Sequence, residues 1–345
     1  MVQAMPLKKP GKGRQRKSPT EILGVDFGST GLKIVRMRNN KGQIALLAAD
    51  ILPPFEVPES ATGHNIRLKV PKAFQANYAA MAVTGASAAV RLLNMQGHVD
   101  AENLKEADVR EQVGLSDEFR VSHVVLPLVR GKQETKVLVV GLPEKESKAV
   151  LSLVSYGPPA PCCLAISGLA AMTAFVHGPG ADLPHDAVAV IESGAKITYM
   201  ALFHKKTLAL VRKFDFGADT IVARVQQQLG VDQETARGII ADGSFDISQP
   251  VHEVMDPFLR QLTISKDFVE RREDCVVGAV YLSGGTTLSR YWMDEVTSAV
   301  GIDAIQWNPF EFVEVAPNAY SDELKGQESR FSAAIGACLG VFHGS

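Results

Sequence analysis

The pattern of apolar and polar residues is clearest over residues 23–35, where two apolar runs flank a short polar turn. The first run leads to the carboxylate of Asp26, and the turn has the sequence Gly28-Ser29-Thr30-Gly31. Apolar runs on both sides of such a turn predict a β-hairpin. Its glycines leave room for a phosphate at the backbone N–H groups, and its serine and threonine add hydroxyl donors. Asp26 could then hold a hydrated Mg²⁺ against the phosphates. An ordinary hairpin with a polar turn is the alternative.

Two later stretches repeat parts of this pattern. Residues 189–200 again contain an apolar run, an acid at Glu192, a polar turn and a second apolar run. Residues 280–288 contain an apolar run that ends in Gly284-Gly285 and opens a predicted helix, where a nucleotide can meet backbone N–H groups. Because the two hairpins lie far apart in the chain, they suggest two similar halves that face each other across a cleft.

Helical periodicity predicts further elements between these stretches. Residues 100–113 have apolar positions at loose helical spacing, with Asp100 as a suitable N-cap. Residues 71–78 suggest one exposed stretch of helix, and residues 331–342 predict a helix of small residues. Residues 251–272 predict a long helix, and its inward face is expected to carry Val254, Phe258, Leu262 and, less regularly, Phe268.

Composition narrows the class of protein. The chain has 345 residues, enough to bury a large core in one or two domains. With 46% hydrophobic and 21% charged residues, it is predicted to be globular. The net charge of −2 gives no overall argument for nucleic-acid or membrane binding. The four cysteines and eight histidines lack metal-ligand spacing, so we expect reduced thiols and no zinc site.

Membrane and targeting signals are weak. The longest nearly apolar run, residues 162–176, is too short to span a bilayer, and the polar N-terminus has no signal-peptide pattern. These observations predict a cytoplasmic protein without a transmembrane segment. Residues 1–20 carry six basic side chains among Pro, Gly and Ser and predict a disordered tail. The tail is either a solubilising extension or a segment attracted to an anionic membrane surface.

The hairpins and the Gly-Gly loop, in this order and spacing, resemble the FtsA/PilM family of actin-like ATPases, and within it the PilM-like proteins of type IV pilus assembly. Residues 26–33 match the family's phosphate-1 hairpin, residues 192–198 its phosphate-2 hairpin, and residues 282–288 its adenosine loop. Residues 212–240 resemble the family's segment between the last two motifs, and the whole resemblance covers residues 21–343. It implies an α/β, actin-like (ribonuclease H-like) fold of two domains with an inserted α+β subdomain of the 1C type.

The resemblance also implies domain boundaries. The expected parts are a tail at 1–20, domain 1A at 21–90, 158–184 and 331–345, the inserted subdomain 1C at 91–157, domain 2A at 185–230 and 276–330, and subdomain 2B at 231–275.

A site for ATP and Mg²⁺ follows from the same resemblance. Asp26 and Glu192 would be the catalytic carboxylates, and Asp26 would hold Mg²⁺ through water. Contacts to the nucleotide would come from Gly28, Ser29, Thr30, Lys33, Gly194, Lys196, Arg237, Gly284, Gly285 and Thr286. Lys196 could instead pair with Glu192 or simply be solvated.

Three positions depart from the family pattern. Glu192 stands where the family usually has Asp, and its extra methylene displaces the carboxylate, which catalytic geometry tolerates poorly. Arg237 and Ile240 stand where PilM-like sequences carry a Glu and a Lys. Ile240 cannot donate a hydrogen bond to ribose, although Arg237 could stack on adenine. Asp215-Phe216-Gly217 stands where two adjacent glycines are common. We therefore expect weak or lost binding of ATP and Mg²⁺ and at most a slow ATPase.

The expected function is that of a cytoplasmic nucleotide-binding scaffold of type IV pilus assembly. The resemblance implies that it docks the cytoplasmic tail of a PilN-like inner-membrane protein near subdomain 1C, which would place it at the inner membrane. Other pilus assembly components are expected partners, nucleic acid is not, and self-association is left open. One alternative is a degenerate actin-like interaction module with weak or no ATP binding. A small-molecule kinase of the same superfamily is less favoured, because we find no carboxylate base for an acceptor hydroxyl.

Overall fold

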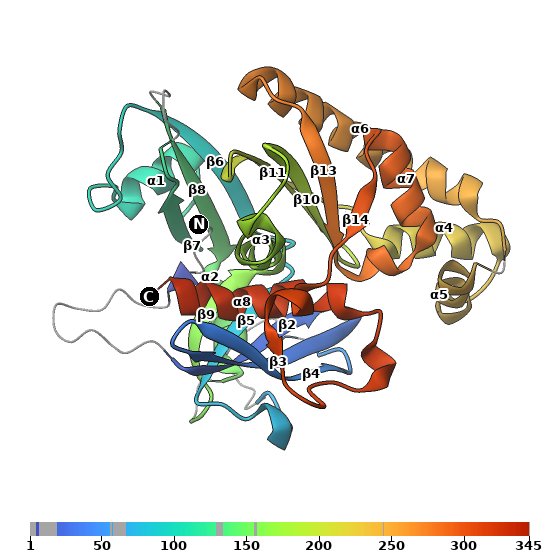
Figure 1. Ribbon diagram of the computed structural model, residues 1–345, viewed down its shortest axis with the longest axis horizontal. Helices are drawn as coiled ribbons and strands as arrows, with labels where there is room; N and C mark the ends of the chain where they lie inside the picture. Colours follow the sequence, from blue (N-terminus) through green and yellow to red (C-terminus); the bar gives the residue numbers. More distant parts are fainter. Residues whose placement is uncertain are drawn as a thin grey trace. The chain divides into compact units, whose positions relative to one another are not determined.

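A computed structural model of the chain describes residues 5–6, 19–55, 57, 67–128, 134–154, 157–243 and 245–344 (Figure 1). Contacts within the chain divide it into two compact units. Unit 1 comprises Met1–Pro179 and Pro309–Ser345, and unit 2 comprises Gly180–Asn308. Residues 309–330, which we expected in the second domain, thus group with unit 1. The finer division into subdomains stays a prediction.

The main sheet of unit 1 is centred on the first predicted hairpin. β2 (Glu21–Gly28) pairs antiparallel with β3 (Gly31–Asn40) and parallel with β5 (Tyr78–Val83). All inner positions of β2 are buried, as expected for a central strand covered on both faces. The strand order is β1-β9-β5-β2-β3-β4-β15. The remaining strands are β1 (Met5–Pro6), β4 (Gln43–Leu52), β9 (Ala160–Ile166) and β15 (Glu314–Val315).

Two helices of small residues pack on this sheet. α8 (Ser332–His343), the predicted helix at 331–342, lies against β2 and β5 and packs along α3 (Ser167–His177) (Figure 1). The packing is close enough to require glycine. A Cβ on Gly336 would lie 1.7 Å from the carbonyl oxygen of Ala170. The short 3₁₀ helices η4 (Pro309–Phe312), η5 (Asp322–Leu324) and η6 (Glu328–Phe331) precede α8.

A smaller sheet in unit 1 has the strand order β6-β8-β7. Its strands are β6 (Ala89–Gln96), β7 (Phe119–Val125) and β8 (Glu134–Pro143), and its helices are α1 (Glu106–Val113) and α2 (Glu144–Ser152). Its core is a cluster of buried valines at positions 109, 121, 137 and 139. The predicted N-cap at Asp100 is wrong. The Asp100 carboxylate accepts a hydrogen bond from the backbone N–H of Glu102 at 3.1 Å, so a local turn forms and the helix begins six residues later.

Two other local predictions need correction. Residues 71–78 form only the 3₁₀ turn η1 (Lys72–Phe74), and Tyr78 already begins β5. Within the tail, which we expected to be disordered, Met5 and Pro6 form β1 and pair with Leu164 and Cys163 of β9. Residues 1–4 and 7–18 of the tail lie outside the described residues.

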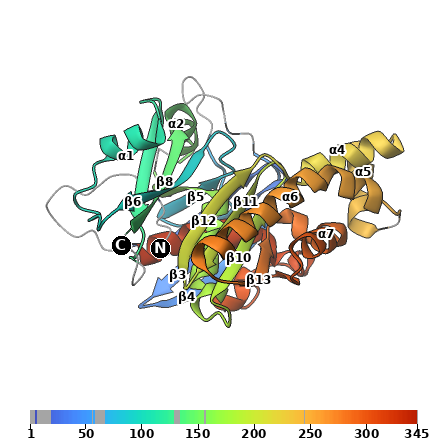
Figure 2. The same cartoon turned by 90° about the horizontal axis from the view of Figure 1, so that it is seen from above.

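Unit 2 is built on the second predicted hairpin. β10 (Ala187–Ser193) and β11 (Thr198–His204) pair antiparallel within a sheet of strand order β12-β11-β10-β13-β14. The other strands are β12 (Thr207–Phe214), β13 (Val277–Ser283) and β14 (Ala304–Gln306). The helices are η2 (Pro179–Ala181, at the boundary), α4 (Ala218–Leu229), α5 (Gln233–Asp242), α6 (Ser248–Glu273), η3 (Gly285–Leu288) and α7 (Arg290–Val300). α6 runs across β12 and β11 and also packs on α4 and α7 (Figure 2).

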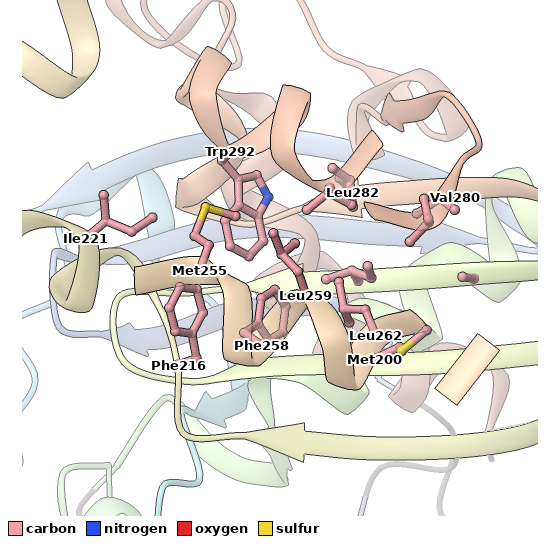
Figure 3. Close-up of a cluster of buried hydrophobic side chains, with 14 of the residues drawn as sticks. Met200, Phe216, Ile221, Met255, Phe258, Leu259, Leu262, Val280, Leu282 and Trp292 are labelled. Carbon is pink, nitrogen blue, oxygen red and sulfur yellow. The ribbon is translucent and has the colours of Figure 1, made fainter. Parts of the chain in front are cut away.

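The core of unit 2 lies between this sheet and its helices (Figure 3). Phe258 of α6 stacks on Phe216 at a centroid distance of 4.7 Å and on Trp292 of α7 at 5.4 Å. Phe258 and Leu262 are buried, as the helical spacing predicts. Phe268 is 42% exposed, so its predicted inward placement is wrong. None of the helices in the described ranges is long and apolar enough to cross a membrane.

Candidate functional site

The first hairpin brings its predicted site residues together in unit 1. Asp26 lies directly opposite Lys33 in the β2–β3 pairing, and Gly28 lies opposite Gly31. Gly31 has a φ of +141°, and a Cβ there would lie 2.8 Å from Cγ2 of Ile51. Glycine is therefore required at this end of the turn. Ser29 and Thr30 form the turn itself, and the side chain of Ser29 is exposed.

The carboxylate of Asp26 is surrounded by polar and charged groups despite its burial. Ser167 Oγ donates a hydrogen bond to Asp26 Oδ1 at 2.6 Å. The Lys33 ammonium lies beside the turn, 2.5 Å from the place that a Cβ on Gly28 would take. Burial raises the pKa of Asp26 above its ordinary value, while Lys33, the Ser167 hydroxyl and Arg330 act in the opposite direction. In such an arrangement the carboxylate can attract a metal cation, and the adjacent ammonium can attract an anion such as phosphate.

Two residues of this cluster were missed by the sequence reasoning. Ser167 begins α3 and lies 141 positions from Asp26. The available signal was its place in the nearly apolar run 162–176, directly after β9, whose carboxyl end lies at the same sheet edge as Asp26. Arg330 belongs to η6, a 3₁₀ turn outside any recognised motif, so no local pattern pointed to it.

The second hairpin in unit 2 is held by hydroxyl and backbone hydrogen bonds. Ser193 Oγ and Thr198 Oγ1 are 2.7 Å apart, and Thr198 Oγ1 donates to the carbonyl oxygen of Phe216 at 2.8 Å. The backbone N–H of Gly194 donates to the carbonyl of Ile197 at 3.0 Å, which closes the turn. Glu192 is 8% exposed. In the parallel pairing of β10 with β13, its backbone lies opposite Ser283.

The start of α4 packs directly on this turn. The backbone N–H groups of Ala218 and Asp219 donate to the carbonyls of Gly194 and Ala195 at 3.1 and 2.8 Å. A Cβ on Gly217 would lie 2.6 Å from both carbonyl oxygens. The departure at residues 215–217 therefore keeps glycine at the position of closest approach, while Phe216 enters the core.

The Gly-Gly loop meets the same hairpin at Ser193. Gly284 has a φ of +92°, and a Cβ there would lie 2.2 Å from the carbonyl oxygen of Ser193. Thr286 Oγ1 donates to that oxygen at 3.3 Å. A Cβ on Gly285 would have no neighbour within 4 Å, so this glycine faces open space. The loop leads into the 3₁₀ helix η3, and α7 begins only at Arg290.

The remaining predicted residues of unit 2 are placed as follows. Arg237 Nη2 donates to Asp219 Oδ1 at 2.9 Å, so its guanidinium is paired with the first turn of α4. Ile240 is partly buried and packs against the core of unit 2. Lys196 is exposed at the hairpin turn. Among the described residues, no group of three or more His, Cys, Asp and Glu side chains could hold a metal ion by itself.

Comparison with known proteins identifies one family and a large number of similar structures, three of which follow. The chain is similar to a structure described as the PilM–PilN type IV pilus biogenesis complex, with 21% identity, 93% of this chain and 98% of that chain covered, and a TM-score of 0.75. It matches ethanolamine utilization protein EutJ from Carboxydothermus hydrogenoformans at 13% identity, with 98% and 92% of the two chains covered and a TM-score of 0.48. It matches the archaeal actin homolog Ta0583 at 11% identity, with 94% and 99% covered and a TM-score of 0.44.

The predicted actin-like fold is confirmed by the first of these matches. A family model described as type IV pilus assembly protein PilM matches residues 168–342, which is half of the chain. This match includes the second hairpin, the Gly-Gly loop and all but the last residue of α8. The chain therefore belongs to the PilM family of type IV pilus assembly proteins.

Proposed function

We propose that this PilM-family chain is a nucleotide-binding scaffold that docks the cytoplasmic tail of a PilN-like inner-membrane protein. The observation that carries the proposal is the charged first hairpin, where Asp26, Lys33 and Ser167 surround a glycine-bounded polar turn. A packed structural hairpin has no need of a buried carboxylate and a buried ammonium beside its turn. Polyphosphate is the ligand chemistry that suits such a turn.

ATP is the proposed ligand, and the first hairpin would hold its phosphates. Its phosphates would contact Gly28, Ser29, Thr30 and Lys33 of that hairpin. The contacts that the resemblance implies for unit 2, at Gly194, Lys196, Gly284, Gly285 and Thr286, stay predictions. Mg²⁺ fits the donor set, because this ion is commonly held by one or two carboxylates together with water and phosphate oxygens. Asp26 would hold such a hydrated ion, and the ion would supply neutralisation of phosphate charge.

Weak binding and slow or absent hydrolysis are the expected behaviour. Ile240 is committed to core packing and offers no donor to ribose, while Arg237 is paired with Asp219. A missing hydrogen bond at a buried ligand group costs about 1–3 kcal/mol, or roughly ten- to a hundredfold in affinity. Glu192, the proposed second catalytic carboxylate, carries one methylene more than the family's Asp.

Calorimetric titration of Mg·ATP tests this proposal. The wild type should bind weakly, Asp26→Ala should bind still more weakly, and Ile240→Lys should bind about tenfold more tightly. Circular dichroism would check that each variant is folded, since Ile240 contacts the core. Tight binding that is unchanged in Asp26→Ala would place the ligand elsewhere. Rapid phosphate release by the wild type would make the protein an active ATPase instead.

The proposed partner has separate support. The similar structure with a TM-score of 0.75 is described as a complex of PilM with PilN. We propose that the corresponding peptide docks near the β6-β8-β7 sheet and so keeps the chain at the inner membrane. Fluorescence anisotropy with the labelled N-terminal tail of the organism's own PilN-like protein should give saturable binding. A scrambled peptide is the control, and equal binding of both peptides would contradict the proposal. Peptide binding without any ATP binding would favour a degenerate interaction module.

A further inference from the structure

Basic side chains gather at one end of the main sheet of unit 1. Glu21 begins β2 and lies opposite Arg38 of β3, and Tyr78 begins the parallel strand β5. These residues mark the amino end of the parallel strands, whereas Asp26 and the turn at residues 28–31 lie toward the carboxyl end. A ligand at the amino end would therefore leave the turn at the other end accessible.

The arginines of β3 connect the segments at this end. Arg36 and Arg38 bind the carboxylate of Glu21 at 2.6 and 3.0 Å. Arg36 Nη1 also donates to the carbonyl oxygen of Ala73 at 3.1 Å. This hydrogen bond holds η1, which begins at Lys72, against β3.

Two more segments bring exposed cations to the same end. Lys41 lies in the turn between β3 and β4. Arg67 Nη2 lies 3.7 Å from the place that a Cβ on Gly157 would take, shortly before β9 begins. Lys69 lies between Arg67 and η1. We call this surface the basic end, and it comprises Arg36, Arg38, Lys41, Arg67, Lys69 and Lys72.

The chain itself does not neutralise the basic end. The two arginines of β3 share the one carboxylate of Glu21. Within the described ranges, Lys41, Lys69 and Lys72 form no ion pair, and all three side chains are exposed. Tail residues 7–18, which lie outside the described residues and are not counted in the basic end, contain six basic residues and no acid. The excess of positive charge at this end favours an extended anionic partner.

We propose that the basic end binds the anionic phospholipid headgroups of a membrane surface. Each basic side chain near such a surface strengthens binding roughly fivefold. Tyr78 is 42% exposed at the same end of the sheet, and tyrosine is enriched where proteins meet the membrane–water interface. This contact goes beyond the proposed function, because it requires neither ATP nor a PilN-like peptide.

Vesicle co-sedimentation of the full chain, without nucleotide or peptide, tests the proposal. The wild type should bind vesicles that contain phosphatidylglycerol and phosphatidylcholine, and it should not bind vesicles of phosphatidylcholine alone. Combining Lys41→Gln, Lys69→Gln and Lys72→Gln should weaken binding at least about tenfold, since three positive charges are lost. High salt should also weaken wild-type binding, because ions screen exposed charges.

The matched control combines Arg260→Gln, Arg271→Gln and Arg290→Gln, which removes the same charge from exposed positions of α6 and α7 in unit 2. This control should bind within about threefold of the wild type. Equal losses in the two combined variants, or equal binding of the wild type to both kinds of vesicle, would overturn the proposal. Binding of the wild type to a mixed-sequence oligonucleotide and to neither vesicle would overturn it in favour of nucleic acid.

A second pair of variants covers a failure to fold. If the combined lysine variant did not fold, Lys69→Glu would decide by the same comparison, with Arg290→Glu as its control. Because the assay contains neither ATP nor peptide, absence of vesicle binding would refute only the membrane contact. Failure of the proposed function in its own titrations would leave the vesicle result unchanged.

Discussion

The two hairpins share a sequence pattern, but different forces hold them. In unit 1 the carboxylate of Asp26 lies opposite the ammonium of Lys33 and accepts a hydrogen bond from Ser167. In unit 2 the turn is fixed by the hydroxyls of Ser193 and Thr198 and by close backbone contacts. Each hairpin buries one carboxylate, Asp26 or Glu192, but only the first places a buried lysine opposite it, and only the second is held by close backbone contacts. Substitutions should affect mainly ligand binding in the first and mainly stability in the second.

The largest expected effect is on the packed hairpin. Gly284→Ala should lower the free energy of unfolding by about 3 kcal/mol, because its Cβ would strike the Ser193 carbonyl and its backbone conformation disfavours a side chain. Gly285→Ala is the matched control and should change the stability by less than about 0.5 kcal/mol, since its Cβ meets open space. Urea denaturation measures both. Equal, small losses would show that the loop does not depend on this close approach.

A smaller loss is expected at the hydroxyl that links the turn to the core. Thr198→Val keeps the shape of the side chain but leaves the Phe216 carbonyl without its donor, which should cost about 1–2 kcal/mol. Thr220→Val, at an exposed position of α4, is the control. If Thr198→Val and Thr220→Val unfolded at the same urea concentration, the Thr198 hydroxyl would not stabilise the second hairpin.

In the first hairpin, removal of a charged side chain should increase the stability of the fold rather than lower it. Burial raises the pKa of Asp26 in the folded state, so the folded protein loses stability as the pH rises through that pKa. Because the burial of the charge outweighs its attraction to Lys33 and Arg330, Asp26→Asn should raise the free energy of unfolding at pH 7, with a smaller gain at pH 4. Thermal melts at the two pH values measure this difference. A destabilised Asp26→Asn at pH 7 would mean that the carboxylate is a structural partner of Lys33.

A second titrating group in unit 1 must be separated from Asp26. Burial, together with the stacked ring of His343, lowers the pKa of His177 to about 4. Since the unfolded chain binds the proton more readily, this group costs stability as the pH falls from about 6.5 to 4. Because His177 is partly exposed, we expect a loss of only about 0.5–1 kcal/mol. His177→Gln should flatten the slope of stability in this window, and an unchanged slope would contradict the assignment.

Local pattern predicted the hairpins, the Gly-Gly loop and the terminal helix because each is a short run of residues with its own turn chemistry. Within these motifs, the required glycines at positions 31 and 284 were also predictable. The actin-like fold came from the order and spacing of the motifs rather than from any one of them.

Tertiary contacts explain what the sequence could not predict. Ser167 and Arg330 join Asp26 only through the packing of segments that lie far apart in the chain. An aspartate can cap a helix or close a local turn with its carboxylate, and the sequence does not show which. At Asp100 the local turn forms. Phe268 follows Leu262 by six residues, out of step with the helical spacing of α6, and it lies 42% exposed.

The central claim is that the first hairpin binds phosphate through a buried lysine, whereas the lysine of the second hairpin is exposed and contributes little. Each hairpin carries one lysine, which gives a matched pair. Lys33 is buried beside Asp26, and Lys196 is exposed at its turn. Calorimetric titration of Mg·ATP into the two glutamine variants should show at least about tenfold weaker binding for Lys33→Gln and less than about threefold for Lys196→Gln. Equal losses, or a larger loss for Lys196→Gln, would contradict the account.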